Sequence, residues 1–194
     1  MSQQLYGLYT KIRNITWNIF LDNHISSLPV DIVKIIQHYQ ITIIKNHEVC
    51  ELKKDEMAVS LFEHNSNQWY IIYQNDILSI ADKRFLLAHE LGHILLGHVS
   101  ILGHPVRSNI KIREEKEADM FALRLLAPAC VLAALNIHTA EQIMKLCNIS
   151  KQSASIRAAR MKELYKRDLF CKHPLEKQML QQFEKFIQTY KNSD

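Results

Sequence analysis

The stretch RFLLAHELGHILLGH, residues 84–98, contains two histidines four positions apart and a glutamate directly after the first of them. Most of its other residues are apolar, which predicts a buried helix. Residues four apart on a helix lie on the same face, so His89 and His93 can direct both imidazoles at one ion. Burying these groups with no role would be costly. The stretch therefore predicts a metal centre, and the alternative is a pair of hydrogen-bonded core histidines.

The spacing H-E-x-x-H is typical of zinc peptidases. Zinc accepts neutral imidazole nitrogens, and a catalytic zinc has three protein ligands with one position left for water. The carboxylate of Glu90 can take a proton from that water, whose pKa the metal lowers to about 7. Five-residue matches also occur by chance, so the identity of a third ligand matters.

A third histidine ligand in the longer pattern H-E-x-x-H-x-x-G-x-x-H would stand at position 99. Leu96 and Val99 occupy the positions of its glycine and its last histidine. His98 lies one residue too early for it. The sequence excludes this pattern, which leaves a carboxylate from a later helix as the third ligand.

The segment REEKEADMFALRLLAP, residues 113–128, offers three glutamates. At roughly 100° per residue, Glu115 shares its helix face with small and apolar residues that suit packing against another helix, so it is the predicted third ligand. Glu114 and Glu117 point elsewhere and are interpreted as solvated surface charges. Asp119, one turn after Glu115, is predicted to accept a hydrogen bond from the free ring nitrogen of a ligating histidine. Glu115→Ala is expected to weaken metal retention, and Glu117→Ala is not.

The rest of the chain predicts helices, then a small sheet, then helices again, which is an α+β arrangement. Asp82 is the expected N-cap of the histidine helix and Gly97 its C-terminal stop, and Pro29 suits the first turn of an earlier helix. Further helices are expected over residues 5–20, 111–126, 139–147, 150–166 and 174–190, and strands at 41–44 and on both sides of a turn at 64–67.

Two domains are expected, a catalytic domain over residues 1–130 and a helical C-terminal segment over 131–194. Within the second, the pair of helices at 139–166 has a helix-turn-helix outline. The 194 residues carry a net charge of +4, too small a sum to indicate nucleic-acid binding by itself.

The composition predicts a cytoplasmic protein with reduced cysteines and no membrane partner. No charged and then apolar leader opens the chain, and no apolar run approaches the roughly 20 residues of a membrane span. None of the four cysteines is in C-x-x-C spacing, so a zinc knuckle or a thioredoxin-like site is not supported.

The segments RFLLAHELGH, residues 84–93, and EKEADMFALRLLAP, residues 115–128, resemble the ImmA/IrrE-type metallopeptidases. A weaker likeness extends to LPVDIVKII upstream and to LCNISKQSASIRAARM downstream, so it covers about residues 28–165. The resemblance implies a zincin-like fold of the glutamate-zincin type, in which an active-site helix packs on a small mixed or antiparallel sheet with flanking helices.

The resemblance also implies a function, namely a zinc-dependent metalloendopeptidase with one Zn²⁺ per chain. Carried over residue by residue, His89, His93 and Glu115 would bind the metal and Glu90 would be the general base. The expected protein substrate is a helix-turn-helix transcriptional repressor, whose cleavage would derepress stress or mobile-element genes. The oligomeric state is not indicated.

Substrate-binding residues are sought next to the metal centre. The strand QWYIIY, residues 68–73, precedes the histidine helix, and as a sheet edge it would let a substrate chain add by backbone pairing. An ordinary core strand is the alternative. Tyr70, Tyr73, His98 and His104 are candidates for contacting substrate or holding the oxyanion, and the sequence does not choose among them.

Two rival functions remain open. One is a non-catalytic zincin-like regulator that binds a repressor. The other is a DNA-binding regulator that works through the basic helix pair at 139–167, where Lys151, Gln152 and Ser153 would face base edges. We favour the peptidase and do not expect DNA binding, because many helix pairs that only pack against their own protein share this outline.

Overall fold

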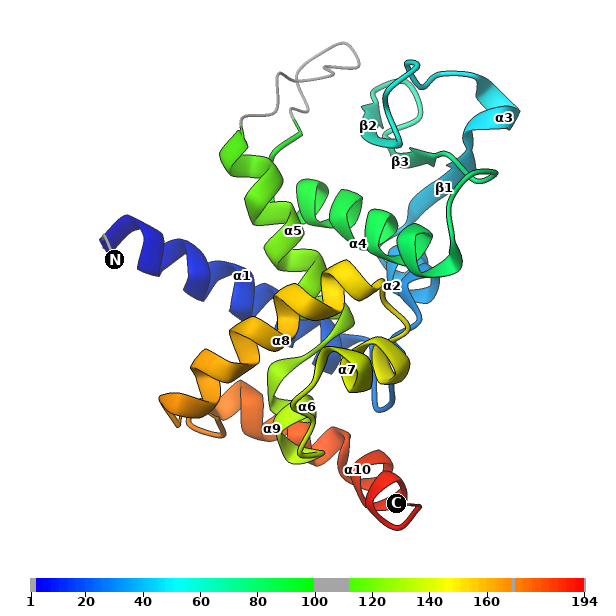
Figure 1. Cartoon of the computed structure of the whole chain (residues 1–194). Helices are drawn as coiled ribbons and strands as arrows, with labels where there is room; N and C mark the ends of the chain where they lie inside the picture. The colour runs from blue at the N-terminus through cyan, green and yellow to red at the C-terminus, as the bar shows by residue number, and fades with distance from the viewer. Residues whose placement is uncertain (1–2, 100–111, 169, 194) are drawn as a thin grey trace. The chain divides into compact units, whose positions relative to one another are not determined.

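The computed structural model describes residues 3–99, 112–168 and 170–193. It divides into two compact units, Asp31–Ala122 and a second unit of Met1–Val30 with Leu123–Asp194. Each unit has its own helices, and the small sheet belongs to the first (Figure 1). The domain boundary expected near residue 130 stays a prediction.

The sheet in Asp31–Ala122 has three strands, β1 (Ile41–Lys45), β2 (Ala58–Glu63) and β3 (Gln68–Tyr73). Their order is β1-β3-β2, with β1 parallel to β3 and β2 antiparallel to it. The polar turn between β2 and β3 closes the predicted hairpin. The sheet is therefore mixed, and the predicted α+β fold with a zincin-like core is confirmed.

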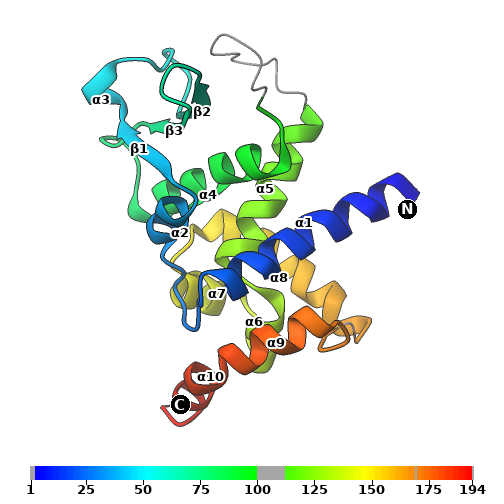
Figure 2. The ribbon, with the colours of Figure 1, turned by 180° about the vertical axis from the view of Figure 1, so that it is seen from behind.

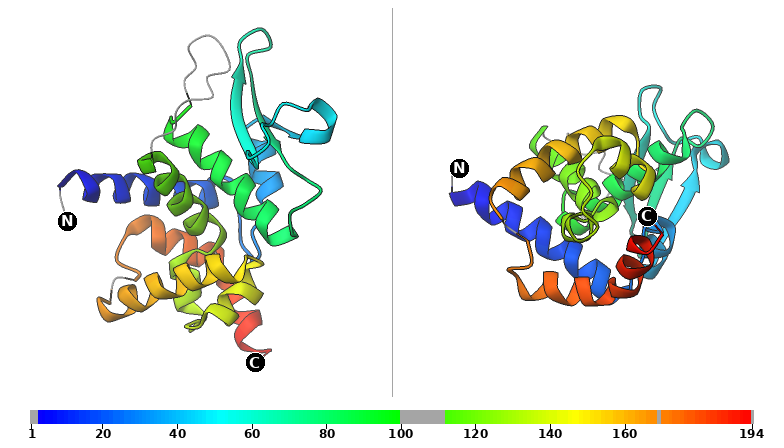
Figure 3. Two further views of the ribbon diagram at one scale, coloured as in Figure 1. Left: turned by 45° about the horizontal axis from the view of Figure 1, so that its top comes forward. Right: turned by 60° about the horizontal axis from the view of Figure 1, so that its bottom comes forward.

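Helix α4 (Ile80–Leu96) carries the histidines and packs against β2 and β3 (Figure 3). Ser79, not Asp82, is its N-cap, since the Ser79 hydroxyl accepts the backbone N–H of Asp82 at 3.1 Å. The expected stop is confirmed, because Gly97 adopts the left-handed conformation with φ 79°. Glycine adopts that conformation without a steric penalty.

Helix α5 (Ile112–Leu126) approaches α4 closely at Gly92. A Cβ atom at this position would lie 3.0 Å from the Phe121 ring and 3.3 Å from the Ala118 Cα. Only glycine fits there without displacing α5. This close approach brings the acidic residues of α5 to the histidines of α4.

Two shorter helices complete this unit, α2 (Ile32–His38) and α3 (Asn46–Val49). Helix α2 begins after Asp31, whose side chain accepts the backbone N–H of Lys34 at 3.2 Å. Pro29 therefore lies before the helix and not in its first turn, which corrects the prediction.

The second unit is helical in its described residues. Its helices besides the end of α5 are α1 (Gln3–Asp22), α6 (Ala129–Ala134), α7 (Ala140–Cys147), α8 (Lys151–Lys166), α9 (Pro174–Gln182) and α10 (Glu184–Lys191). Helix α1 contacts α9 (Figure 2), where the Phe20 and Phe183 rings meet edge to face with centroids 5.8 Å apart. The single helix expected at 174–190 is two helices that meet at Phe183.

The predicted helix pair at 139–166 is present as α7 and α8, which pack against each other. Thr139 forms a capping box with Gln142, and Ser150 caps α8. Asn148 ends α7 in the left-handed conformation, which turns the chain into α8. Among the described residues, no helix is long and apolar enough to cross a membrane.

Candidate metal centre

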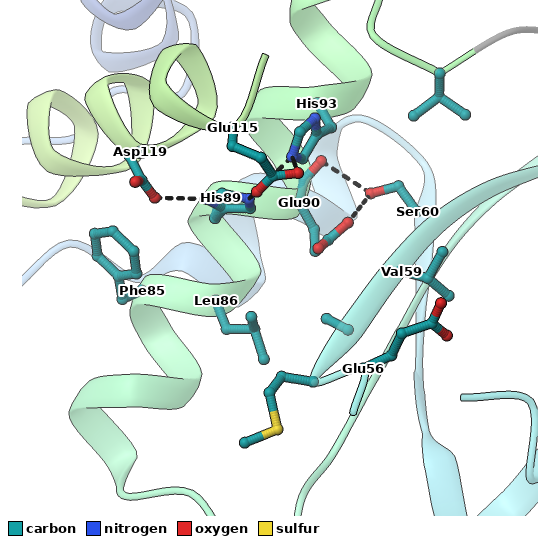
Figure 4. Close-up of a pocket in the computed structure, with 13 residues that line it drawn as sticks. Glu56, Val59, Ser60, Phe85, Leu86, His89, Glu90, His93, Glu115 and Asp119 are labelled. Atoms are coloured by element: carbon teal, nitrogen blue, oxygen red, sulfur yellow. Dashed lines mark hydrogen bonds and ion pairs between the residues drawn. The ribbon is translucent and has the colours of Figure 1, made fainter. Parts of the chain in front are cut away.

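The structure brings His89, His93 and Glu115 together at one point between α4 and α5 (Figure 4). The Nε2 atom of His89 lies 2.9 Å from His93 Nε2 and 3.2 Å from Glu115 Oε2. His93 Nε2 lies 3.6 Å from Glu115 Oε1. Ligand atoms of a tetrahedral zinc lie about 3.3–3.6 Å apart, given metal–ligand distances of about 2.0–2.2 Å. The two distances to Glu115 lie at or close to this range, and the two imidazole nitrogens lie about 0.4 Å closer together than it. The three side chains therefore offer the donor set of a zinc ion, with the histidine rings slightly closer than in an occupied site.

Asp119 lies behind His89, on the side away from the three converging atoms. Its Oδ1 atom is 2.9 Å from His89 Nδ1. If Nδ1 carries the proton and donates it to the carboxylate, Nε2 is left with a lone pair for a metal. The carboxylate thus selects the tautomer of His89 that a ligand needs, and it does so from a side chain that is 53% exposed.

His93 is held by a longer chain of contacts. Its Nδ1 atom lies 3.0 Å from His98 Nδ1, and His98 Nε2 lies 3.2 Å from Glu117 Oε2. The other oxygen of Glu117 accepts a hydrogen bond from Arg113 Nε at 2.7 Å. We call His98, Glu117 and Arg113 the His93 support chain.

One requirement fixes which nitrogen atoms of the support chain carry protons. For Nε2 of His93 to offer a lone pair to a metal, its Nδ1 must carry the proton and donate it to His98 Nδ1. His98 must then carry its own proton on Nε2, which donates to Glu117. The carboxylate and the guanidinium of Arg113 end the chain with opposite charges, so every group in it has a partner of the right kind.

Glu117 is therefore not the solvated surface charge that the sequence predicted. It is only 7% exposed and hydrogen-bonds two side chains. The helical wheel placed it away from Glu115 correctly, but it could not show that His98 lies on that side. The expectation that Glu117→Ala leaves metal retention unchanged is revised accordingly.

The two histidines differ in how burial and charge set their pKa values. Burial, and then the charges of His89 and His98, lower the pKa of His93 to about 3, so its ring stays neutral as a ligand must. Burial also acts to lower the pKa of His89. The hydrogen bond to Asp119 and the charges of Glu90, Asp119 and Glu115 outweigh it, and the pKa of His89 is raised.

Glu90 lies beside the ligand atoms and is only 7% exposed. The hydroxyl of Ser60, on β2, donates a hydrogen bond to its Oε2 at 2.5 Å. Burial raises the pKa of Glu90, and the Ser60 hydrogen bond opposes this by favouring the carboxylate. A carboxylate with a raised pKa and a fixed orientation suits a general base. Sequence reasoning missed Ser60, whose only signal is a lone hydroxyl in the apolar strand AVSLFE.

A cavity of about 490 Å³ opens onto the metal centre. Ser60 and Val59 on β2 form one wall, and Phe85 on α4 is part of another (Figure 4). Ala58 also lines the cavity. Strand β2 ends the sheet order, so one side of its backbone is not paired within the sheet. The cavity is of the size that binding pockets have in proteins.

The predicted substrate-contacting residues lie elsewhere. Tyr70 and Tyr73 belong to β3, which is the central strand, so the edge-strand hypothesis for residues 68–73 is wrong and the ordinary core strand is correct. The Tyr73 hydroxyl donates to Asn75 at 3.3 Å. His98 lies behind His93 in the support chain. That Tyr70, Tyr73 or His98 contacts substrate stays a prediction, and His104 lies outside the described residues.

Fold and site together define a class of protein, an α+β peptidase core with a His-His-Glu centre and an adjacent carboxylate. Comparison with known families agrees with this. The chain belongs to the family Peptidase_M78, the IrrE N-terminal-like domain, which it matches over residues 44–159, more than half of its length. The resemblance drawn from the two motifs is confirmed, and the protein is a peptidase. No curated protein matches the chain.

Proposed function

We propose that this protein is a zinc-dependent endopeptidase that cleaves a peptide bond in a protein substrate. The observation that carries the proposal is the convergence of His89, His93 and Glu115 within one cavity that also contains the buried carboxylate of Glu90. Their donor set is that of a catalytic zinc with an open position, and not the closed Cys-rich set of a structural one.

The residues divide the work of hydrolysis between them. Zinc held by His89, His93 and Glu115 would polarise the carbonyl of the scissile bond and make water a stronger acid. Glu90, oriented by Ser60, takes the proton of the attacking water and transfers it to the nitrogen of the leaving amine. The water oxygen bonds to the carbonyl carbon as the C–N bond breaks, so the products are one carboxylate and one amine.

The unpaired side of β2 is where an extended substrate would bind. A peptide added there would pair its backbone with the strand that contributes Ala58 and Val59 to the cavity. Backbone pairing positions a peptide bond without regard to side chains, which suits a protein substrate. Selection among substrates then falls to the cavity walls.

For the substrate we propose a helix-turn-helix repressor in the cytoplasm, by analogy with the ImmA/IrrE-type peptidases that the two motifs resemble. The DNA-binding alternative has less support. Of the three residues expected to face base edges, Lys151 and Gln152 are exposed but Ser153 is only 7% exposed. Arg157, the first arginine of the same helix, is 5% exposed. Buried side chains cannot reach base edges.

The test compares wild type with Glu90→Gln and His89→Ala. Elemental analysis should find about one zinc per chain in wild type and Glu90→Gln, and little in His89→Ala. Mass spectrometry of protein N-termini, in cells that express each form, should find a new N-terminus within a repressor for wild type only. Identical N-termini in all three would contradict the endopeptidase. Cleavage by Glu90→Gln would exclude Glu90 as the base.

A further inference from the structure

A second cavity, of about 500 Å³, lies within the unit formed by Met1–Val30 and Leu123–Asp194. Residues of α1, α8 and the end of α5 form much of its wall. Its lining includes six cationic side chains, namely Arg13, Arg124, Arg157, Arg160, Arg167 and Lys172. So many cations around one hollow need an explanation, because like charges in a partly desolvated space repel each other.

Negative charge is nearly absent from this lining. Glu176 is its single carboxylate, and one of its oxygens already accepts the backbone N–H of Lys172 at 3.2 Å. In the described part of the chain, none of the five arginines lies within ion-pair distance of a carboxylate. Lys172 pairs with Asp168 at 3.3 Å, so it is the charge of the five arginines that has no ion-pair partner among the described residues.

Arg157 adds to this charge from the lining of the cavity. The residue is 5% exposed, and its Nε donates a hydrogen bond to the Ala127 carbonyl at 2.7 Å. Among the described residues, Ala127 is its one hydrogen-bond partner. No fully buried side-chain nitrogen or oxygen of the described residues lacks a partner. Arg157 lines the cavity, and its terminal nitrogens donate to no other described residue, which leaves them available to a ligand there.

Aromatic rings hold three of the other guanidinium groups. Arg13 lies over Trp17 with its Cζ 4.7 Å from the ring centroid. Arg124 and Arg160 lie near the Tyr9 ring, at 5.8 and 6.0 Å. Contact with a ring face orients a guanidinium without using its N–H groups. In Arg13, Nε and one terminal nitrogen also donate to Asn14 Oδ1, both at 3.3 Å.

The pKa values of the buried arginines agree with this picture. Burial, and then the charges of Arg157, Arg160 and Arg13, lower the pKa of Arg124 to about 9. Burial is also the main cause that lowers the pKa of Arg157 to about 10. Burial and the neighbouring arginines disfavour the charged forms, and a bound anion would oppose both effects.

We propose that this cavity binds a small molecule carrying one or more phosphate groups. Guanidinium groups pair with phosphate through two parallel hydrogen bonds, which matches several arginines better than a single carboxylate would. The volume lies in the range of small-molecule pockets and exceeds what inorganic phosphate needs, so the ligand has an organic part. This site is separate from the metal centre and does not depend on the proposed function.

The experiment measures binding to the full-length chain by thermal melting and calorimetry, with sodium chloride at matched ionic strength as the reference. The probes are pyrophosphate, adenosine triphosphate and glucose 6-phosphate, with adenosine as the phosphate-free control. A phosphorylated probe at about 100 times its Kd should raise the Tm by about 5–10 °C. The nucleotide and the sugar phosphate distinguish the two main sources of a phosphate ester.

Variants locate the site. Arg160→Gln should weaken binding about tenfold or more, since it removes charge-assisted hydrogen bonds from a half-buried position. Lys162→Gln removes one charge from an exposed position of the same helix outside the lining and should change nothing. His89→Ala should bind the probe normally, which separates this cavity from the metal centre.

Three results would overturn the proposal. One is that no phosphorylated probe raises the Tm above the sodium chloride reference. Another is that Arg160→Gln and Lys162→Gln weaken binding equally, which would indicate a diffuse charge effect. The third is that Arg160→Gln weakens the binding of single-stranded oligonucleotides or acidic peptides but not that of the small phosphorylated probes. The ligand of the cavity would then be a macromolecule and not a small molecule.

Discussion

The His93 support chain allows a sharp prediction about metal affinity. His98→Phe keeps an aromatic ring of similar size but removes the nitrogen that accepts the Nδ1 proton of His93. His93 is 1% exposed and the His98 side chain 7%, so water cannot easily replace the acceptor. Leaving a buried donor unpaired costs about 1–3 kcal/mol. Because 1.4 kcal/mol is tenfold, zinc should bind about 5- to 150-fold more weakly.

Asp119→Ala provides the comparison, since it removes the corresponding partner of His89. The Asp119 side chain is 53% exposed, so water can accept the His89 proton in its place. Solvent also screens the lost charge. We expect a loss of about 2- to 10-fold, smaller than that of His98→Phe. The order of the two losses follows from burial and not from the sequence, where the aspartate is the more obvious candidate.

The assay is a competition titration of zinc against a chelating dye at fixed pH, with the visible spectrum of the cobalt-substituted protein as a second readout. His98→Asn is the rescue variant, because its amide oxygen can accept the His93 proton. It should recover much of the affinity that His98→Phe loses, and it should restore the cobalt spectrum. The Tm of each metal-free variant separates loss of affinity from loss of folding.

Two outcomes would refute the reasoning. If His98→Phe binds zinc as tightly as wild type, the support chain does not position His93. If His98→Asn is as weak as His98→Phe while both fold normally, the hydrogen bond is not the cause.

Two further predictions concern the close helix contact and the metal-free histidines. Gly92→Ala should lower the free energy of unfolding by up to about 2 kcal/mol, because overpacking against α5 exceeds the gain in helix propensity. Gly7→Ala, in open space on α1, should raise the free energy of unfolding by up to about 1 kcal/mol. Chemical denaturation that shifts the two free energies in the same direction would contradict this. In NMR titrations of the metal-free protein, His89 should titrate above its usual pKa of 6.5 and His93 should stay neutral down to about pH 3. Asp119→Asn removes the carboxylate that favours the protonated ring, so it should lower the pKa of His89; an unchanged midpoint would show that Asp119 does not set it.

Local spacing explains why much of the metal centre could be predicted. His89 and His93 share a helix face whatever the rest of the chain does, and Glu115 was selected by the small residues on its own face. The caps of α7 and α8 are likewise local, since Thr139 and Ser150 contact backbone only three residues away. Such relations depend on helix geometry, which is the same in every protein.

Other residues acquire their roles only through contacts between elements. Ser60 orients Glu90 from thirty residues away. Glu117 is a buried partner because His98, nineteen residues away, lies within hydrogen-bond distance of it. Gly92 matters because α5 passes over it. No periodicity records which helix or strand a side chain will meet.

The sequence by itself indicated the class of site: which residues offer metal ligands, which carboxylate lies beside them, and that helices precede and follow a small sheet. These depend on side-chain chemistry and on spacing along one element. Tertiary structure alone decided that β3 is central and β2 is at the edge, that a chain of three side chains supports His93, and that arginines from α1, α5 and α8 line one cavity. The physical reason is that pairing, burial and charge balance are properties of groups brought together from distant parts of the chain, and they exist only once the chain has folded.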